Sequence, residues 1–288
     1  TDMCSFEITL EAGENGTITG ATTVNHGANE TYTITPASDC YYISSFTLDG
    51  VAQTITTPEG MTLDLDSIVA HHTIAASFEV YTYTLTSSVD GEGTITATSV
   101  VDCGSDTTFA ITPADGYHLD SVVVDGVNQG VIDTYTFTNV HADGNIIAYF
   151  SINHYTINMV VNGANGTVDP VGDLDVVHGA TPAYTFAPVA CYELSSLLID
   201  GEEVVDDVVD NVYTFPAVDA NHSAVATFDH IMYPITVNNT GNGVGTVNGL
   251  TDYPVGDTIT SVTCGTAYFF NMMAGEGSHI SDFTWGGG

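Results

Sequence analysis

Apolar and polar residues alternate along many short stretches of this chain. These stretches are rich in Val, Ile, Thr, Tyr and Phe, and they are bounded by Gly, Asn, Asp or Pro. A period of two in segments this short is typical of β-strands that bury one face and are joined by tight turns. No stretch combines a 3.6-residue apolar period with helix caps. The pattern therefore predicts an all-β fold.

The alternating pattern also repeats along the chain. One strand of each repeat ends in the same Asp-Gly pair, and the glycines Gly50, Gly126 and Gly201 are 76 and 75 residues apart. A period of this size predicts modules that each bury a small core. Because the linkers are very short, we expect a tandem array of small β-modules of about 75 residues forming a rod or filament. The predicted modules span residues 1–80, 81–153, 154–230 and a truncated 231–288.

Further landmarks keep the same register. They are an early Gly-Thr turn, a Thr- and Phe-rich strand that ends at Pro, a Tyr-Thr-Phe strand and a closing strand with strict alternation. In the second module they lie at 91–95, 109–113, 135–137 and 145–150. The first module departs most, because residues 58–66 replace the usual Tyr-Thr-Phe strand.

The second module reads Gly-x-Gly-Thr-Ile, Phe-Ala-Ile-Thr-Pro-Ala-Asp-Gly-Tyr, Val-Val-Val-Asp-Gly and Tyr-Thr-Phe-Thr-Asn-Val in order. This series resembles the divergent internalin-B-type bacterial repeat, and the resemblance covers nearly the whole chain. It implies stalk or adhesive modules of large secreted or surface-anchored bacterial proteins. It brings no catalytic residue to any position, so we expect no enzyme and no cofactor.

The chain contains no Lys or Arg, against 36 Asp and Glu, and its formal net charge is -36. Such a chain repels nucleic acids and anionic membrane surfaces, which bind proteins largely through Lys and Arg. No apolar run is long enough for membrane insertion as a helix. With 43% hydrophobic and 12% charged residues the chain can pack cores. Since trypsin-like proteases find no site, we expect a protease-resistant protein in an extracellular or cell-surface location.

Four of the five cysteines occupy equivalent places in the repeats. Cys40 and Cys191 precede the strand that leads to Asp-Gly, and Cys103 and Cys264 each precede a glycine. The simplest pairing is Cys40 with Cys103 and Cys191 with Cys264, although sequence alone does not fix connectivity. Each bridge would join one module to the next, and disulfides imply an oxidising compartment.

Cys4 remains without a partner in this scheme. One interpretation is an intermolecular bridge to a preceding subunit or module, and the alternative is a buried or free thiol.

Two carboxylate pairs are spaced two residues apart, Asp64 with Asp66 and the pair at 173 and 175. On a strand such pairs share a face. A solvated polar face is the favoured interpretation, and we expect no dedicated metal site. The overall charge would still attract weakly bound divalent cations such as calcium.

The predicted fourth module ends before its last strands. Either the chain is a piece of a longer repeat protein, or a neighbouring subunit supplies the missing strands. Both interpretations predict end-to-end partners, which are adjacent repeats or copies of the chain. The predicted function is a non-catalytic structural segment of a bacterial surface filament, stalk or adhesin.

The alternative function is a carbohydrate- or surface-binding module array. In that case the aromatic side chains of Tyr41, Tyr42 and Trp285 would stack on sugars. The partner would then be a glycan or a surface receptor.

Overall fold

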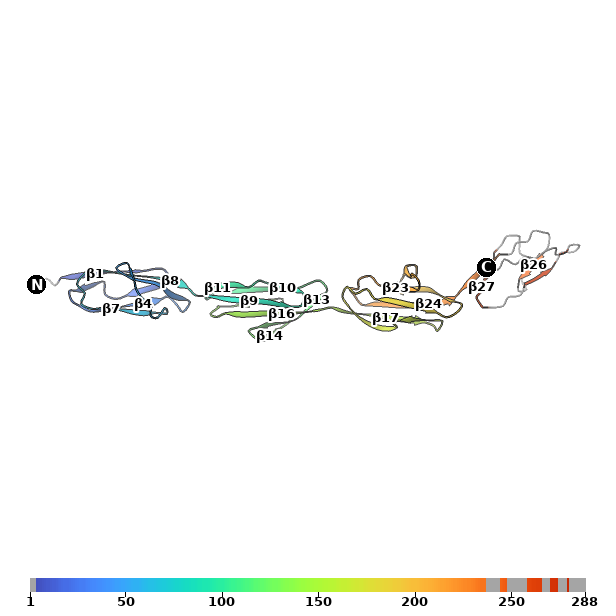
Figure 1. Cartoon of the computed structure of the whole chain (residues 1–288), viewed down its shortest axis with the longest axis horizontal. Coiled ribbons are helices and arrows are strands. Elements are labelled where there is room, and N and C mark those ends of the chain that lie inside the picture. Colours follow the sequence, from blue (N-terminus) through green and yellow to red (C-terminus); the bar gives the residue numbers. More distant parts are fainter. Residues whose placement is uncertain (1–3, 237–243, 248–257, 266–269, 274–278, 280–288) are drawn as a thin grey trace. The chain divides into compact units, whose positions relative to one another are not determined.

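The computed structural model describes residues 4–236, 244–247, 258–265, 270–273 and 279. Figure 1 shows the strands coloured along the sequence. By its internal contacts the chain divides into two compact units, Thr1–Ile152 and Asn153–Gly288. All described elements are strands except one short 3-10 helix, η1 (Val205–Asp207). The all-β prediction and the tandem repetition are confirmed.

The first module consists of a five-stranded sheet in the order β3-β1-β8-β5-β6 and a three-stranded sheet in the order β2-β4-β7. The strands are β1 (Ser5–Ala12), β2 (Gly16–Thr19), β3 (Thr23–Asn25), β4 (Glu30–Pro36), β5 (Tyr41–Leu48), β6 (Val51–Ala52), β7 (Met61–Leu65) and β8 (His72–Val80).

The second module repeats this arrangement, with the sheets β11-β9-β16-β13-β14 and β10-β12-β15. Its strands are β9 (Thr82–Asp90), β10 (Gly93–Ile95), β11 (Ser99–Asp102), β12 (Thr107–Pro113), β13 (Tyr117–Val124), β14 (Val127–Gly130), β15 (Thr134–Phe137) and β16 (Gly144–Ile152).

The third module has the sheets β19-β17-β24-β21-β22 and β18-β20-β23. Its strands are β17 (His154–Asn162), β18 (Gly166–Asp169), β19 (Gly172–Val177), β20 (Ala183–Pro188), β21 (Tyr192–Ile199), β22 (Glu202–Glu203), β23 (Val212–Thr214) and β24 (His222–His230).

Beyond it, β25 (Met232–Thr236) pairs with β27 (Thr258–Thr263), and β26 (Val244–Val247) pairs with β28 (Phe270–Met273). Much of the predicted fourth module, 231–288, falls outside the described residues, so its truncation stays a prediction.

The first and the closing strand of each module run parallel and side by side, as β1 with β8, β9 with β16 and β17 with β24. The closing strand is flanked on its other side by an antiparallel neighbour, so it lies inside the five-stranded sheet. Its inward side chains are buried, as Ile146, Ala148 and Phe150 show in β16.

Each module has one core, formed by side chains of both sheets. In the first module the cluster includes Ile8 of β1 and Ile34 of β4, both at most 1% exposed. The Thr- and Phe-rich strand contributes one fully buried ring to each core, from Tyr32, Phe109 and Tyr184. The apolar positions of the alternating strands therefore lie on the sheet faces that pack together in the core.

The glycine of the recurring Gly-Thr turn lies against the ring of the closing-strand phenylalanine. A Cβ on Gly93 would come within 2.5 Å of the Phe150 ring. The corresponding distances are 2.2 Å at Gly16 and 2.7 Å at Gly166. This signature is therefore explained by packing, because any larger residue would displace a core ring.

The Asp-Gly pair forms a two-residue hairpin turn. Between β5 and β6, Asp49 and Gly50 have φ values of 53° and 78°. Positive φ at both central residues is the type I′ geometry, for which Asp-Gly is a preferred sequence. The strand before each turn also carries a register shift at the same place, between Ile43 and Ser45 in the first module.

Residues 58–66 were expected to replace the Tyr-Thr-Phe strand, yet the strand itself is present as β7. It pairs with β4, and Leu63 lies opposite Tyr32. Met61, Leu63 and Leu65 alternate with exposed residues and pack against the core. The strand keeps the alternation of apolar residues but not the aromatic residues of the other modules. Its sequence therefore does not match the Tyr-Thr-Phe motif.

We expect Gly93→Ala to lower the free energy of unfolding by about 1–3 kcal/mol, because the new methyl group overlaps the Phe150 ring. Denaturant unfolding monitored by circular dichroism measures the change. In a chain that also carries Phe150→Leu, Gly93→Ala should lower the free energy of unfolding by a clearly smaller amount. An equal cost in both backgrounds would contradict the packing explanation.

The two buried tyrosines form a matched pair. The Tyr32 hydroxyl donates to the carbonyl oxygen of Ala21 at 2.9 Å, whereas the buried Tyr184 hydroxyl has no partner in the described part of the chain. Tyr32→Phe should therefore destabilise by about 1 kcal/mol, while Tyr184→Phe should be neutral or stabilising. Phe109 already occupies this place in the second module. Equal losses for the two variants in denaturant unfolding would refute this assignment.

Candidate functional site

The first joint between modules is built around a single linker residue, Tyr81, which separates β8 from β9. The Tyr81 N–H donates to the carbonyl oxygen of Cys40 at 2.9 Å, and the Tyr81 carbonyl accepts from the N–H of Cys103 at 2.8 Å. A disulfide joins Cys40 to Cys103 with a Cα–Cα distance of 5.2 Å. The linker is therefore held on both sides by hydrogen bonds and covalently by the bridge.

The joint after the third module has the same construction around Ile231. Its N–H donates to the carbonyl oxygen of Cys191 at 2.9 Å, and its carbonyl accepts from Cys264 at 3.0 Å. The Cys191–Cys264 disulfide also has a Cα–Cα distance of 5.2 Å. The structure thus contains both disulfide pairs that the repeat positions suggested. The bridges span 63 and 73 residues, and loops of that size correspond to about 4 kcal/mol of stabilisation each.

A glycine follows the second cysteine of each bridge. Gly104 has a φ of 79°, and a Cβ on it would lie 3.4 Å from the Cys40 sulfur. Gly265 has a φ of 76°, and its Cβ would lie 3.3 Å from the Cys191 sulfur. The backbone turns through the left-handed region beside the disulfide, which only glycine does without strain.

Cys4 occupies the linker position at the amino-terminal end of the first module. Its carbonyl accepts from the N–H of His26 at 2.9 Å, as the Tyr81 carbonyl does from Cys103. The Cys4 thiol is exposed and forms no bridge within the described part of the chain. It is therefore not buried, and an intermolecular bridge stays a prediction.

His141 lies beside the first disulfide. The sequence pattern did not predict this position of His141. Its Nε2 is 3.5 Å from the Cys40 sulfur and 3.6 Å from Oδ2 of Asp39. Its Nδ1 is 2.7 Å from the carbonyl oxygen of Asn139. A carbonyl only accepts, so Nδ1 carries a hydrogen, and Nε2 is the ring nitrogen that faces the sulfur and the Asp39 carboxylate. His141 is 101 residues from Cys40 and belongs to no recurring motif.

Of the aromatic side chains suggested for sugar stacking, Tyr41 and Tyr42 lie in β5 next to the first joint. The Tyr42 ring packs on Tyr81 at a centroid distance of 4.8 Å, and its hydroxyl donates to Glu79 at 2.9 Å. This hydrogen bond, together with burial, raises the pKa of Tyr42. Trp285 lies outside the described residues. Tyr42 is therefore engaged within the joint, and glycan stacking stays a prediction.

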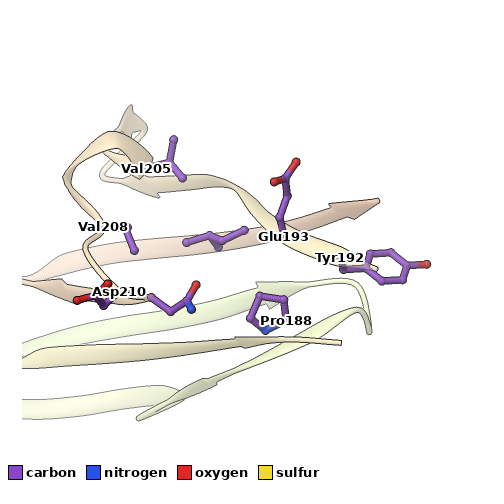
Figure 2. Close-up of a pocket in the computed structure, with 8 residues that line it drawn as sticks. Pro188, Tyr192, Glu193, Val205, Val208 and Asp210 are labelled. Atoms are coloured by element: carbon purple, nitrogen blue, oxygen red, sulfur yellow. The ribbon is translucent and has the colours of Figure 1, made fainter. Parts of the chain in front are cut away.

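The third module carries an open depression of about 510 Å³ near the second bridge (Figure 2). The Tyr192 ring extends away from Val208 and Asp210 on the other side of the depression (Figure 2). The ring centroids of Tyr192 and His230 are 4.0 Å apart, and the Tyr192 hydroxyl lies 2.7 Å from Nε2 of His230. The lining residues are Pro188, Tyr192, Glu193, Leu194, Val205, Val208, Asp210 and Asn211.

Three of the four carboxylates in the two pairs, those of Asp64, Asp173 and Asp175, have polar partners within the chain. Asp64 and Asp66 lie in a shallow polar depression, where Thr31 donates to Asp64 at 2.6 Å. In the other pair, Asp175 lies 2.8 Å from Nδ1 of His154. These contacts agree with a solvated polar face, and weak binding of calcium stays a prediction.

Histidine and aspartate fasten the Asp-Gly turn to the closing strand. In the third module, Asp200 accepts from the N–H of Ser223 at 2.7 Å and lies 2.6 Å from Nδ1 of His222. Asp49 makes the same contacts in the first module. The backbone hydrogen bond, followed by the histidine contact, lowers the pKa of both aspartates.

The comparison with known families decides what these modules are. The divergent InlB B-repeat domain matches the chain three times, at residues 6–80, 83–154 and 155–232. The chain belongs to the divergent InlB B-repeat family. The three matched segments coincide with the three complete pairs of sheets, so the B-repeat is the structural unit of the array.

No curated protein sequence matches the B-repeat array. Among solved structures, it is similar to the Bacillus anthracis TIE protein, with 8% sequence identity and a TM-score of 0.31. That match covers 91% of this chain and 60% of the other, so the array spans less than two thirds of that protein. A likeness this low carries no argument about fold or role. Within the described residues of the array, no helix has the length and apolar character needed to cross a membrane.

We expect Asp200→Asn to lower the free energy of unfolding by about 0.5–1 kcal/mol at pH 7, since the variant keeps the turn but loses charge-assisted hydrogen bonds at an exposed site. The native pKa is lowered from 3.8. The aspartate therefore stabilises the fold above that value, and the gain is lost as the pH falls through the native pKa. Thermal unfolding between pH 7 and pH 2.5 should show the two curves converging below about pH 4.

Asp210 provides the control, because it is exposed and also has a positive φ of 50°. Asp210→Asn should change the free energy of unfolding at pH 7 by clearly less than Asp200→Asn does. A gap between the unfolding free energies of Asp200→Asn and the wild type that does not narrow as the pH falls from 7 to 2.5 would contradict the charge-based explanation.

Proposed function

We propose that the B-repeat array is a non-catalytic structural segment of a bacterial surface filament, stalk or adhesin. The joints carry this proposal. Each bridged joint has one linker residue whose N–H and carbonyl are both bonded, with a disulfide across it. Such a joint restrains bending and twisting far more than a flexible linker would. A series of restrained joints suits a spacer that holds something at a distance from the cell.

The composition supports an extracellular location. Disulfides persist mainly in oxidising compartments, and two bridges link successive modules. With no Lys or Arg, the chain offers trypsin-like proteases no cleavage site. The charge of -36 also opposes adhesion to anionic polymers and membranes. A long-lived, exposed spacer benefits from each of these properties.

We further propose that the partners are adjacent repeats or copies of the chain, joined end to end. Cys4 stands at the linker position of the first module, next to His26 at the place that Cys103 occupies in the following module. Since His26 cannot form a disulfide, a covalent bond to a preceding module would use the exposed Cys4 thiol.

Small-angle X-ray scattering of the oxidised chain tests the spacer role. A strand of nine residues spans about 30 Å, so four modules in line would give a length on the order of 120 Å and a radius of gyration of roughly 35 Å. A compact globule of this chain length would have a radius of gyration of about 19 Å. We expect the larger value.

The double variant Cys40→Ser/Cys103→Ser is the control for joint rigidity. It should keep the circular dichroism spectrum of the array and broaden its distribution of dimensions. A compact wild-type particle, or equal flexibility of the wild type and the variant, would overturn the proposal.

A further inference from the structure

The surroundings of the first disulfide contain more than the bridge needs. Among the described residues, Cys40, Cys103 and His141 are the one group of three metal-binding side chains whose ligand atoms all lie within 4.8 Å of one another. Both cysteines are buried, at 8% and 9% exposure, whereas His141 is exposed. A disulfide forms without a histidine, so the position of His141 calls for a separate explanation.

We propose that the reduced form of this joint is a zinc site, with Cys40, Cys103 and His141 as ligands and Asp39 as the fourth. Two thiolates, one imidazole nitrogen and one oxygen form a donor set that suits tetrahedral zinc. The joint then exists in two cross-linked states, a disulfide under oxidising conditions and a metal bridge under reducing conditions. This inference rests on the geometry of the joint and not on the proposed role of the array.

The orientation of His141 supports the assignment. Its Nδ1–H donates to the carbonyl oxygen of Asn139 at 2.7 Å, so Nε2, which lies 3.5 Å from the Cys40 sulfur, is the ring nitrogen that would bind zinc. A hydrogen bond from the second ring nitrogen to a carbonyl or carboxylate is the usual support of a zinc-bound histidine. The Oδ2 atom of Asp39 lies 3.6 Å from the same Nε2.

These separations match the size of a zinc site. With Zn–S near 2.3 Å and Zn–N near 2.0 Å, ligand atoms of a tetrahedron lie about 3.3–3.8 Å apart. The distances from Nε2 to the Cys40 sulfur and to Asp39 already fall in this range. The two sulfur atoms must separate, from the roughly 2 Å of any disulfide to about 3.8 Å. Rotation about the cysteine side-chain bonds provides that movement. The carboxylate of Asp39, which is outside the group whose ligand atoms all lie within 4.8 Å of one another, must move closer to the sulfur atoms.

The chemistry balances with an external thiol as the reductant. Two thiol molecules reduce the Cys40–Cys103 bond by two electrons and are themselves oxidised to a disulfide, leaving two protein thiols. Zn²⁺ then replaces the two thiol protons, which pass to solvent, and the dithiolate site with neutral His141 has no net charge before Asp39 is added. Reoxidation by a disulfide reverses the sequence and releases the metal.

The Cys191–Cys264 bridge is a control within the same chain. It has the same linker hydrogen bonds and the same Cα–Cα distance. The described part of the chain places no third metal-binding side chain within the same distance of its two sulfur atoms. A site that depends on cysteines alone would form equally at both joints, whereas the proposed site forms only at the first.

The experiment uses the full chain, reduced with a phosphine, desalted without oxygen and titrated with Co²⁺ and then Zn²⁺. We expect one Co²⁺ per chain with thiolate-to-cobalt charge-transfer and tetrahedral d–d absorption, displaced by one equivalent of Zn²⁺. The oxidised chain should show no such absorption. His141→Ala should weaken binding at least tenfold. Cys191→Ser/Cys264→Ser should leave affinity and spectrum unchanged.

Several results would overturn the inference. They are the absence of thiolate-to-cobalt bands in the reduced chain, equal binding by His141→Ala, or loss of binding in Cys191→Ser/Cys264→Ser. Folding is checked independently, because oxidised His141→Ala should still form both disulfides and keep the circular dichroism spectrum. A variant that passes this check and still binds Co²⁺ as the wild type does would exclude His141 as a ligand.

Discussion

The parallel pairing of the first and closing strands is the constraint on which the rest of this array depends. Parallel neighbours run in the same direction, so the chain enters a module at one end of the five-stranded sheet and leaves it at the opposite end. An antiparallel pair would return the chain to its point of entry. Because the closing strand is flanked on both sides, it cannot leave the sheet without breaking two ladders. The exit point is therefore fixed, and one linker residue suffices to start the next module.

The cysteine positions follow from this geometry. Each bridged joint brings the residue before the β5-type strand close to the residue that follows the next module's β3-type edge strand, as Cys40 before β5 and Cys103 after β11 show. At the joint between the second and third modules the equivalent positions in the sequence are Gly116 and His178, which cannot form a disulfide. The division into two compact units falls at that joint, after Ile152. Each of the two disulfides therefore lies within one compact unit.

Much of the fold could be predicted from the sequence because its determinants are local or repeated. Strand alternation, the Asp-Gly turns and the paired cysteine positions each depend on a few adjacent residues or on a fixed period. What could not be predicted depends on contacts between distant residues. His141 meets Cys40 across 101 positions, and the difference between Tyr32 and Tyr184 depends on one carbonyl oxygen within reach of the hydroxyl. No pattern of residue types encodes such distances.

The absence of Lys and Arg raises the question of what stabilises the carboxylates that the fold uses. Asp49 and Asp200 accept from backbone N–H groups and contact histidines. Glu203 accepts from the Ser196 hydroxyl and the Leu197 N–H, which lowers its pKa. Backbone N–H groups are already held in place by the strands. A hydrogen bond from such a neutral donor therefore does not require a long Lys or Arg side chain to lose conformational entropy, and its strength depends little on salt. The described cores contain no buried charged residue that would require a cation as its partner. The contacts that hold these carboxylates therefore need no Lys or Arg, so the absence of both residue types costs the described modules little stability.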